Sequence, residues 1–206
     1  LYGEASPSEF MEGLHIAFLE ESLPKHNFEI HPHRHDNLHQ LLIVEQGSVL
    51  AQINERCREE SGPCILSIPP KEVHGFVHQP DVKGYIITIS QSFLMQLFSD
   101  TEREEFQFIF RMPLVARLEP DRHTVRAIEY LGPQLMSEFA SKEVAQSSMI
   151  GAYLKVLFVL LRRSLKQETS EVHQHDERIA AYEQFMSQVE DHYLQHWSVD
   201  QYADVL

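Results

Sequence analysis

The stretch from residue 40 to residue 89 constrains the fold most, because short apolar runs in it alternate with glycine and proline. The runs span residues 40–44, 48–54, 64–68, 75–78 and 84–89. They are rich in isoleucine, valine and leucine and are shorter than ordinary helices. Short segments of this composition and spacing are typical of an antiparallel β-sandwich or barrel. We therefore expect a mainly β domain over this part of the chain.

The period of the apolar residues changes from two to about 3.6 after Ser90, which indicates helices. Residues 93–98 suit a short helix, and Thr101 with Glu104 forms a capping-box pattern that predicts the start of another. Residues 124–140 and 150–165 predict two amphipathic helices that pack as a hairpin. The second of these is apolar nearly all round. We expect the barrel, its partner helix or a second copy of the chain to cover it.

The distribution of apolar and polar residues divides the chain into four predicted parts. Residues 1–120 form the predicted barrel with short helices, and residues 121–166 form a helical dimerisation region. Residues 167–178 are polar and charged without an apolar period, so we interpret them as a linker. Periodicity returns in residues 179–206, where Ser198 and Gln201 form a second capping box. The helix that they open stops with the chain, which suggests a truncated domain.

Charge and composition argue against several functions for this chain. It has 17 basic and 31 acidic residues, a formal net charge of −14, which should repel a phosphate backbone. We expect DNA to be contacted only by chain outside this one. Lys155 interrupts the most apolar run, so we expect no membrane span. Cys57 and Cys64 are interpreted as free thiols of a cytoplasmic protein.

Histidines form the pattern with the most chemical meaning. His31, His33, His35 and His39 fall within nine residues, and His74 and His78 follow later. On a strand His33 and His35 would share a face, because side chains alternate with a period of two. Two imidazoles on one face can hold a metal ion or a carboxylate-bearing ligand if further groups join them. Gln40 and His74 are the candidates, and the alternative is that several of these histidines are surface or supporting residues.

Two short motifs resemble the pair of motifs found in cupins. The first consists of His33, His35, Gln40 and Gly47, and the second of Gly62, Pro69, Lys71 and His74. The resemblance implies a cupin-like double-stranded β-barrel in which the three motif histidines face inward. Gln40 occupies the position of the usual glutamate, and Lys71 that of the usual glycine.

The same resemblance implies a candidate metal site. Its ligands would be His33, His35 and His74, with Gln40 or His39 as a further ligand. Three neutral imidazoles suit a divalent ion such as Zn, Ni or Fe. The glutamine removes one negative charge from the site, whereas enzymatic cupins more often keep the carboxylate.

The chain as a whole resembles AraC-type transcription regulators. Residues 35–42 and 68–76 are similar to the N-terminal cupin domain of that family, and residues 193–206 to the opening helices of its helix-turn-helix domain. Within the family the sequence is most similar to regulators that respond to 4-hydroxybenzoate or 4-hydroxyphenylacetate. The resemblance implies a homodimer, joined through the helical region, that controls transcription of a catabolic operon.

We therefore expect a small aromatic acid to bind inside the barrel. The candidate ligand-binding residues are His33, Arg34, His35, Gln40, Leu42, His74, Phe76 and Tyr85. The polar members can hydrogen-bond a carboxylate or a phenol, and the aromatic and aliphatic members can enclose a ring. For the apolar residues the alternative is an ordinary place in the barrel core.

Two other classes of function compete with a non-enzymatic regulator. A mononuclear metal-dependent cupin enzyme, such as a dioxygenase or an isomerase, explains the histidines equally well. It does not explain the charged linker or the capped helix at the end of the chain. A purely structural dimerisation module leaves the spacing of the histidines unexplained. We therefore prefer the regulator.

Overall fold

The computed structural model describes residues 13–119, 123–141, 143–165, 181, 184–189 and 191–205. The chain divides into two compact units, Leu1–Ser164 and Leu165–Leu206. Every strand that the structure describes belongs to the first unit. The predicted linker, residues 167–178, lies outside the described residues.

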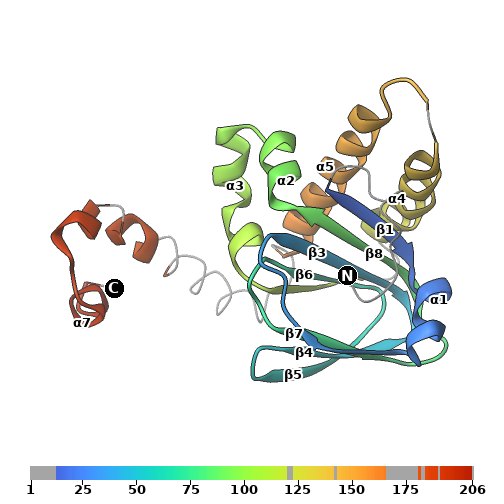
Figure 1. Ribbon diagram of the computed structural model, residues 1–206, viewed down its shortest axis with the longest axis horizontal. Coiled ribbons are helices and arrows are strands. Elements are labelled where there is room, and N and C mark those ends of the chain that lie inside the picture. Colours follow the sequence, from blue (N-terminus) through green and yellow to red (C-terminus); the bar gives the residue numbers. More distant parts are fainter. Residues whose placement is uncertain are drawn as a thin grey trace. The chain divides into compact units, whose positions relative to one another are not determined.

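Two antiparallel sheets face each other in the first unit (Figure 1). The five-stranded sheet has the order β1 (Leu14–Phe18), β8 (Lys83–Ser90), β3 (Leu38–Gln46), β6 (Cys64–Ile68), β9 (Leu114–Arg117). The four-stranded sheet has the order β2 (Glu29–His33), β7 (His74–His78), β4 (Ser48–Ile53), β5 (Arg56–Ser61). The five strands predicted from the sequence are all present, and the mixed class with a cupin-like barrel is confirmed.

The first described segment is more regular than the sequence suggested. Leu14–Phe18 pairs along its whole length with β8 and forms an edge of the five-stranded sheet. A short helix α1 (Leu19–Ser22) and a 3-10 turn η1 (Leu23–His26) follow directly. Leu19 and Leu23 are buried, so this segment contributes to the core of the barrel.

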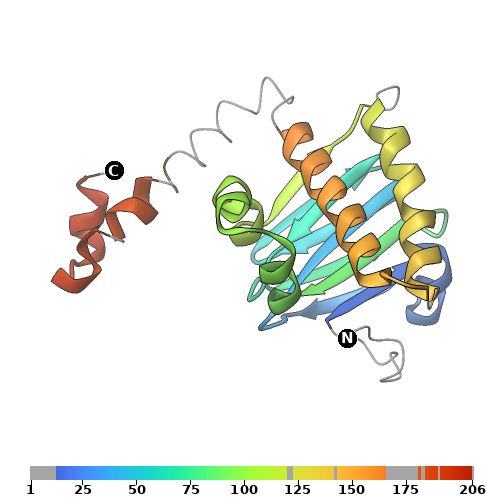
Figure 2. The same cartoon turned by 90° about the horizontal axis from the view of Figure 1, so that it is seen from above.

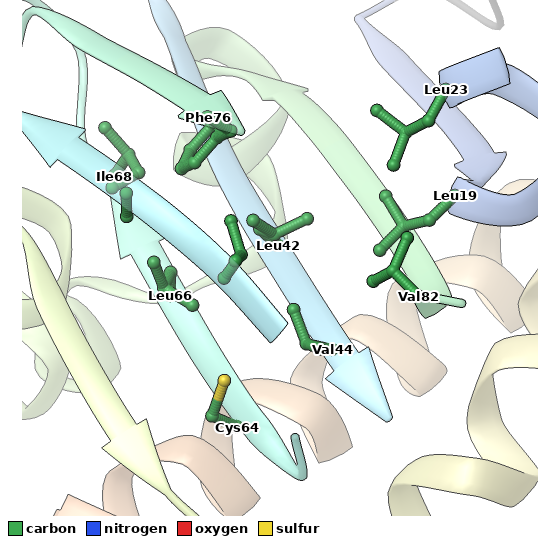
Figure 3. Close-up of a cluster of buried hydrophobic side chains, with 11 residues drawn as sticks. Leu19, Leu23, Leu42, Val44, Cys64, Leu66, Ile68, Phe76 and Val82 are labelled. Atoms are coloured by element: carbon green, nitrogen blue, oxygen red, sulfur yellow. The ribbon is translucent and has the colours of Figure 1, made fainter. Parts of the chain in front are cut away.

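The core of the barrel lies between the two sheets. Its side chains come from both sheets and from α1 and η1: Leu19, Leu23, Leu42, Val44, Val49, Ala51, Cys64, Leu66, Ile68, Phe76 and Val82 (Figure 3). Because side chains alternate along a strand, Gln40 on β3 faces the same interior as Leu42 and Val44. His39 on the same strand faces the opposite way.

Helices cover the outer face of the five-stranded sheet (Figure 1). They are α2 (Gln91–Leu97), α3 (Asp100–Arg111), α4 (His123–Ala140) and α5 (Gln146–Leu165). Figure 2 shows α4 and α5 side by side, which confirms the two predicted amphipathic helices. In the described parts of the chain, none of the helices has the length and apolar character that a membrane crossing requires.

The start of α3 differs from the prediction by two residues. Its N-cap is Ser99 and not Thr101, and the partner in the capping box is Glu102. The Ser99 hydroxyl accepts from the Glu102 main-chain N–H at 3.4 Å, and a Glu102 carboxylate oxygen accepts from the Ser99 N–H at 2.8 Å. Either serine or threonine can cap a helix, so the sequence alone does not choose between the two registers.

The second unit contains short helical elements. Residues 184–189 are helical, and η2 (Tyr193–Gln195) and α7 (Val199–Ala203) follow. Ser198 caps α7 and forms the predicted capping box with Gln201. Trp197 stacks on His192 with ring centroids 3.8 Å apart.

Candidate functional site

Three imidazoles meet at one end of the barrel. His33 is the last residue of β2 and pairs in register with His74, the first residue of β7, while His35 lies in the loop after β2. The ring centroids are 4.4 Å apart for His33 and His74, 4.8 Å for His33 and His35, and 5.6 Å for His35 and His74. The structure therefore brings the three predicted histidines together. The strand ends at His33, so His35 joins the others through the loop.

Gln40 reaches the three imidazoles from the five-stranded sheet. Its amide oxygen lies 2.8 Å from Nε2 of His74, and its amide nitrogen lies 3.3 Å from Nε2 of His35. The same nitrogen donates to Thr88 Oγ1 at 3.4 Å. Gln40 is buried, so it ties the histidine site to the interior of the barrel.

Main-chain contacts also hold two of the rings. Nδ1 of His74 lies 2.9 Å from the carbonyl oxygen of Glu72, and Nδ1 of His33 lies 2.8 Å from that of His31. A carbonyl oxygen only accepts, so in both pairs the ring nitrogen donates. The Lys71 N–H in turn donates to the His35 carbonyl oxygen at 2.7 Å, which joins the two loops that carry the histidines.

Burial keeps two of the three imidazoles neutral. The pKa of His35 is lowered to about 4, mainly by burial and also by the neighbouring His33 and His74. Burial also lowers the pKa of His74 to about 4, although its hydrogen bond to Glu72 acts in the opposite direction. A neutral ring has one N–H. His74 can therefore donate to Glu72 or to Gln40, but not to both.

The proton of His74 is better placed on Nδ1, because the carbonyl of Glu72 is fixed whereas the Gln40 side chain can rotate. Nε2 is then the unprotonated nitrogen of His74, as it is in a neutral His33. His35 accepts from the Gln40 amide through its own Nε2. With Nδ1 protonated, Nε2 of His33 and of His74 each carries an unshared electron pair. The electron pair on Nε2 of His35 accepts from Gln40 in this structure and is available to a Lewis acid only when the Gln40 amide turns away.

The three imidazoles fit a divalent metal ion. One ligand nitrogen from each lies within 4.8 Å of the others. Zinc binds imidazole nitrogens at about 2.0–2.1 Å, so the rings would close slightly around it. Metal-bound histidines usually donate their other N–H to a carbonyl or carboxylate, as His33 and His74 do here. Gln40 contributes the nearest amide oxygen.

His39 does not belong to this site, and the prediction that it could act as a metal ligand is wrong. It is fully buried on the helix side of the sheet, where its Nε2 lies 2.9 Å from Ser67 Oγ. Its ring packs at 5.9 Å from Phe158 and 6.2 Å from Phe110. Adjacent residues of a strand point to opposite faces, so His39 cannot accompany Gln40.

Tyr85 was expected to line the barrel interior, and this expectation is also wrong. Its hydroxyl donates to the carbonyl oxygen of Ile128 on α4 at 3.2 Å, and its ring packs against Gly132. The neighbouring Ile86 faces the interior core in its place. Arg34 lies in the loop between His33 and His35, where its side chain is exposed.

Apolar side chains lie directly behind the imidazoles. Leu42 and Phe76 are both buried in the interior core (Figure 3). The Phe76 ring is 5.8 Å from that of His74 and 5.9 Å from that of His78. His78 was not among the predicted site residues. The alternation of His74, Phe76 and His78 along β7 was the signal that could have identified it.

Comparison with known proteins places the chain in a family. Residues 13–184 match the family model described as "AraC-like ligand binding domain". No curated protein matches the chain.

Several solved structures are similar to parts or most of the chain. ToxT from Vibrio cholerae bound to (E)-4-(8-methylnaphthalen-1-yl)but-3-enoic acid is 11% identical over 94% of this chain and 71% of that chain, with a TM-score of 0.44. An RmlC-like cupin from Shewanella frigidimarina is 20% identical over 40% of this chain and 69% of that chain, with a TM-score of 0.30. A cupin-like protein from Thermotoga maritima is 22% identical over 43% of this chain and 77% of that chain, with a TM-score of 0.27.

The family match spans most of the chain, from the first described strand to the helical residues of the second unit. It includes all three site histidines, Gln40 and the helices that cover the five-stranded sheet. The chain therefore belongs to the family of AraC-like ligand-binding domains.

Proposed function

We propose that this chain is the effector-binding region of an AraC-type transcription regulator, and that its effector is a small aromatic acid of the 4-hydroxybenzoate or 4-hydroxyphenylacetate type. The observation that carries the proposal is the meeting of His33, His35 and His74 beside the buried Phe76 in a ligand-binding domain of this family. A few convergent polar groups in front of an apolar interior suit a small molecule with one charged end and one ring.

The carboxylate of such an acid needs positive charge or hydrogen-bond donors. The neutral imidazoles instead present unprotonated nitrogens. A divalent ion such as Zn, Ni or Fe, held by His33, His35 and His74, would supply the positive charge that the protein lacks at this point. A metal ion on Nε2 of His35 and His74 would replace the contacts that these atoms make with the Gln40 amide, whose oxygen would then be placed as a further ligand.

Regulation requires that the effector bind two conformations of the protein with different affinity. The strand β3 connects the site to the helices, because Gln40 faces the imidazoles while His39 packs against Phe158 of α5. A shift of β3 on binding would therefore reach α5 directly. A second copy of the chain would dock on the outer side of α5, where Met149 and Val156 are 47% and 45% exposed. DNA would be contacted only by chain outside this one, because this chain carries an excess of acidic residues.

Calorimetric titration tests the proposal. The chain is titrated with 4-hydroxybenzoate and with 4-hydroxyphenylacetate, once after loading with Zn²⁺ and once after treatment with a chelator. At least one acid should bind the loaded protein, and His33→Ala and His74→Ala should each weaken that binding by tenfold or more. His123→Ala is the matched control, because His123 is an exposed histidine at the start of α4.

Two results would overturn the proposal. If both alanine variants bind the acid as tightly as the parent chain, the histidine site is not the effector site. If the loaded protein consumes the acid during incubation, as followed by chromatography, the chain is a metal-dependent enzyme.

A further inference from the structure

His78 has a property that the barrel core does not explain. It is 5% exposed, and no residue in the described part of the chain provides a hydrogen-bond partner for its Nδ1. Leaving a buried polar atom without a partner destabilises the folded protein. Folded proteins keep few such atoms, and those that they keep need an explanation.

The surroundings of His78 are apolar. Its partner in the neighbouring strand is Val49, which is fully buried, and the ring nearest to it on its own strand is that of Phe76. Its main-chain N–H donates to the carbonyl oxygen of Phe28 at 2.9 Å, so the backbone at this point is satisfied. Burial lowers the pKa of His78 to about 4, and the ring is therefore neutral at physiological pH. Nδ1 of the side chain is the atom that lacks a partner among the described residues.

The position of His78 relates it to the histidine site. His74, Phe76 and His78 alternate along β7 and face the barrel interior, with Phe76 between the two imidazoles at 5.8 Å and 5.9 Å. An aromatic ring packed against Phe76, at the usual centroid distance of about 4.5–7 Å, would lie between them. Substituents at opposite ends of that ring would then point towards His74 and His78.

We infer that His78 forms a second subsite, which binds a hydroxyl group para to the acidic substituent of the effector. The inference rests on the proposed function and deepens it, because it assigns a residue that recognises the para-hydroxyl group of the proposed effectors. A phenol hydroxyl can both donate and accept, so it satisfies Nδ1 of His78 whichever ring nitrogen carries the proton.

Occupation of this subsite would also change the core. Figure 3 shows Phe76, Leu42 and Ile68 pointing towards one another, and all three are buried. A ring that enters between the sheets must move these side chains apart. The ligand would thereby bind an open conformation of the barrel more tightly than a closed one. A ligand-controlled switch requires such a difference in affinity.

The test compares ligands that differ only in the hydroxyl group. Dissociation constants of 4-hydroxybenzoate, 3-hydroxybenzoate and benzoate are measured by calorimetry for the parent chain and for His78→Phe. The parent should bind 4-hydroxybenzoate at least tenfold more tightly than the other two acids. In His78→Phe the three acids should bind about equally. This variant should also unfold at a higher urea concentration, since its ring has no polar atom to leave unpartnered.

His39→Phe is the matched control. His39 is also a buried histidine whose Nδ1 has no partner among the described residues, but it faces the helices. This variant should keep the parent's preference for 4-hydroxybenzoate. The three dissociation constants are also measured for His78→Leu, and circular dichroism checks that each variant is folded. A folding defect of His78→Phe alone then does not decide the result.

The outcomes separate the inference from the proposed function. If the parent binds benzoate and 4-hydroxybenzoate equally, or if a folded His78 variant keeps the preference, the subsite is wrong while the effector-binding role stands. If the parent binds none of the three acids and none of the phenylacetates, both proposals fail.

Discussion

Gly132 on α4 lies against the ring of Tyr85 on β8, and a methyl group at this glycine would come within 2.5 Å of Tyr85 Cε1. The contact joins the helix layer to the five-stranded sheet, and both residues are buried. We predict that Gly132→Ala destabilises the protein by about 1–3 kcal/mol, the usual range for overpacking a filled core. Urea denaturation followed by circular dichroism measures the change.

Gly151→Ala is the control for this substitution. Gly151 also lies within a helix, but the nearest atom to its added methyl group is the flexible end of Leu97 at 3.0 Å. Because alanine favours helices by about 0.5–1 kcal/mol over glycine, this variant should be close to neutral or more stable. A Gly132→Ala protein that is as stable as Gly151→Ala would show that α4 does not pack on Tyr85 as described.

Arg117 neutralises a buried carboxylate at the edge of the barrel. The Glu60 side chain is 1% exposed, and it accepts from Nε and Nη2 of Arg117 at 2.8 and 3.0 Å. Nε of Arg58 lies 3.3 Å from Oε1 of Glu60, the oxygen that also accepts from Nη2 of Arg117. We predict that Arg117→Ala lowers the free energy of unfolding by about 3 kcal/mol, because it leaves a buried charge with weaker compensation.

The exposed Arg56 on the same strand as Arg58 offers a comparison. Arg56→Ala should change the free energy of unfolding by less than about 0.5 kcal/mol, as is usual at surface positions. Equal effects of the two substitutions in urea denaturation would contradict the role assigned to Arg117.

The buried histidines predict that the protein loses stability in mild acid. Burial lowers the pKa of His39 to about 3 and that of His78 to about 4, from an unfolded value of 6.5. Below pH 6.5 the unfolded chain therefore binds more protons than the folded one. These two groups therefore leave the stability unchanged above pH 6.5 and reduce it as the pH decreases from 6.5 towards 4.

Urea denaturation at pH 7, 6 and 5 measures this dependence. The double variant His39→Phe, His78→Phe should show a shallower decline than the parent, because two of the groups that take up protons on unfolding are removed. An identical slope for parent and variant would mean that these rings are protonated in the folded protein as easily as in the unfolded one.

The outer side of α5 provides the test of dimerisation. Leu157 and Leu161 are fully buried within a single chain, so a glutamate at either position should unfold the protein. Val156 is exposed, so a substitution there tests whether a second copy of the chain binds to this side of α5. We predict that Val156→Glu converts a dimer to a monomer in sedimentation velocity without changing the circular dichroism spectrum. A variant that sediments as the parent does would place the interface elsewhere.

Periodicity was enough to predict β3, β4, β6, β7, β8 and the two long helices, but it did not predict β1, β2, β5 and β9. It also did not give the direction of each side chain in the five-stranded sheet. This sheet is buried on both faces, by the barrel interior and by the helices, so β3 reads as an almost continuous apolar run. Such a run gives no indication of which residues face inward. The sequence analysis predicts His39 as a possible metal ligand and Tyr85 as a ligand-binding residue, but both pack on the helix side.

The histidine site was predicted from a resemblance, and the structure supplied what the resemblance lacked. His33 and His74 meet because β2 and β7 pair, whereas His35 joins them through a loop whose course depends on its main-chain bond to Lys71. Such loop contacts have no periodic signature in a sequence. His78 lay on the same face as His74 by simple alternation, but its lack of a partner is visible only in three dimensions.

A native mass spectrum of the chain, purified without chelator and mixed with 4-hydroxybenzoate, tests the central claim most directly. The account predicts that the parent and His123→Ala each gain the mass of one acid molecule per chain, and that His74→Ala gains none. If His74→Ala takes up the acid to the same extent as the parent, the three imidazoles are not where the effector binds.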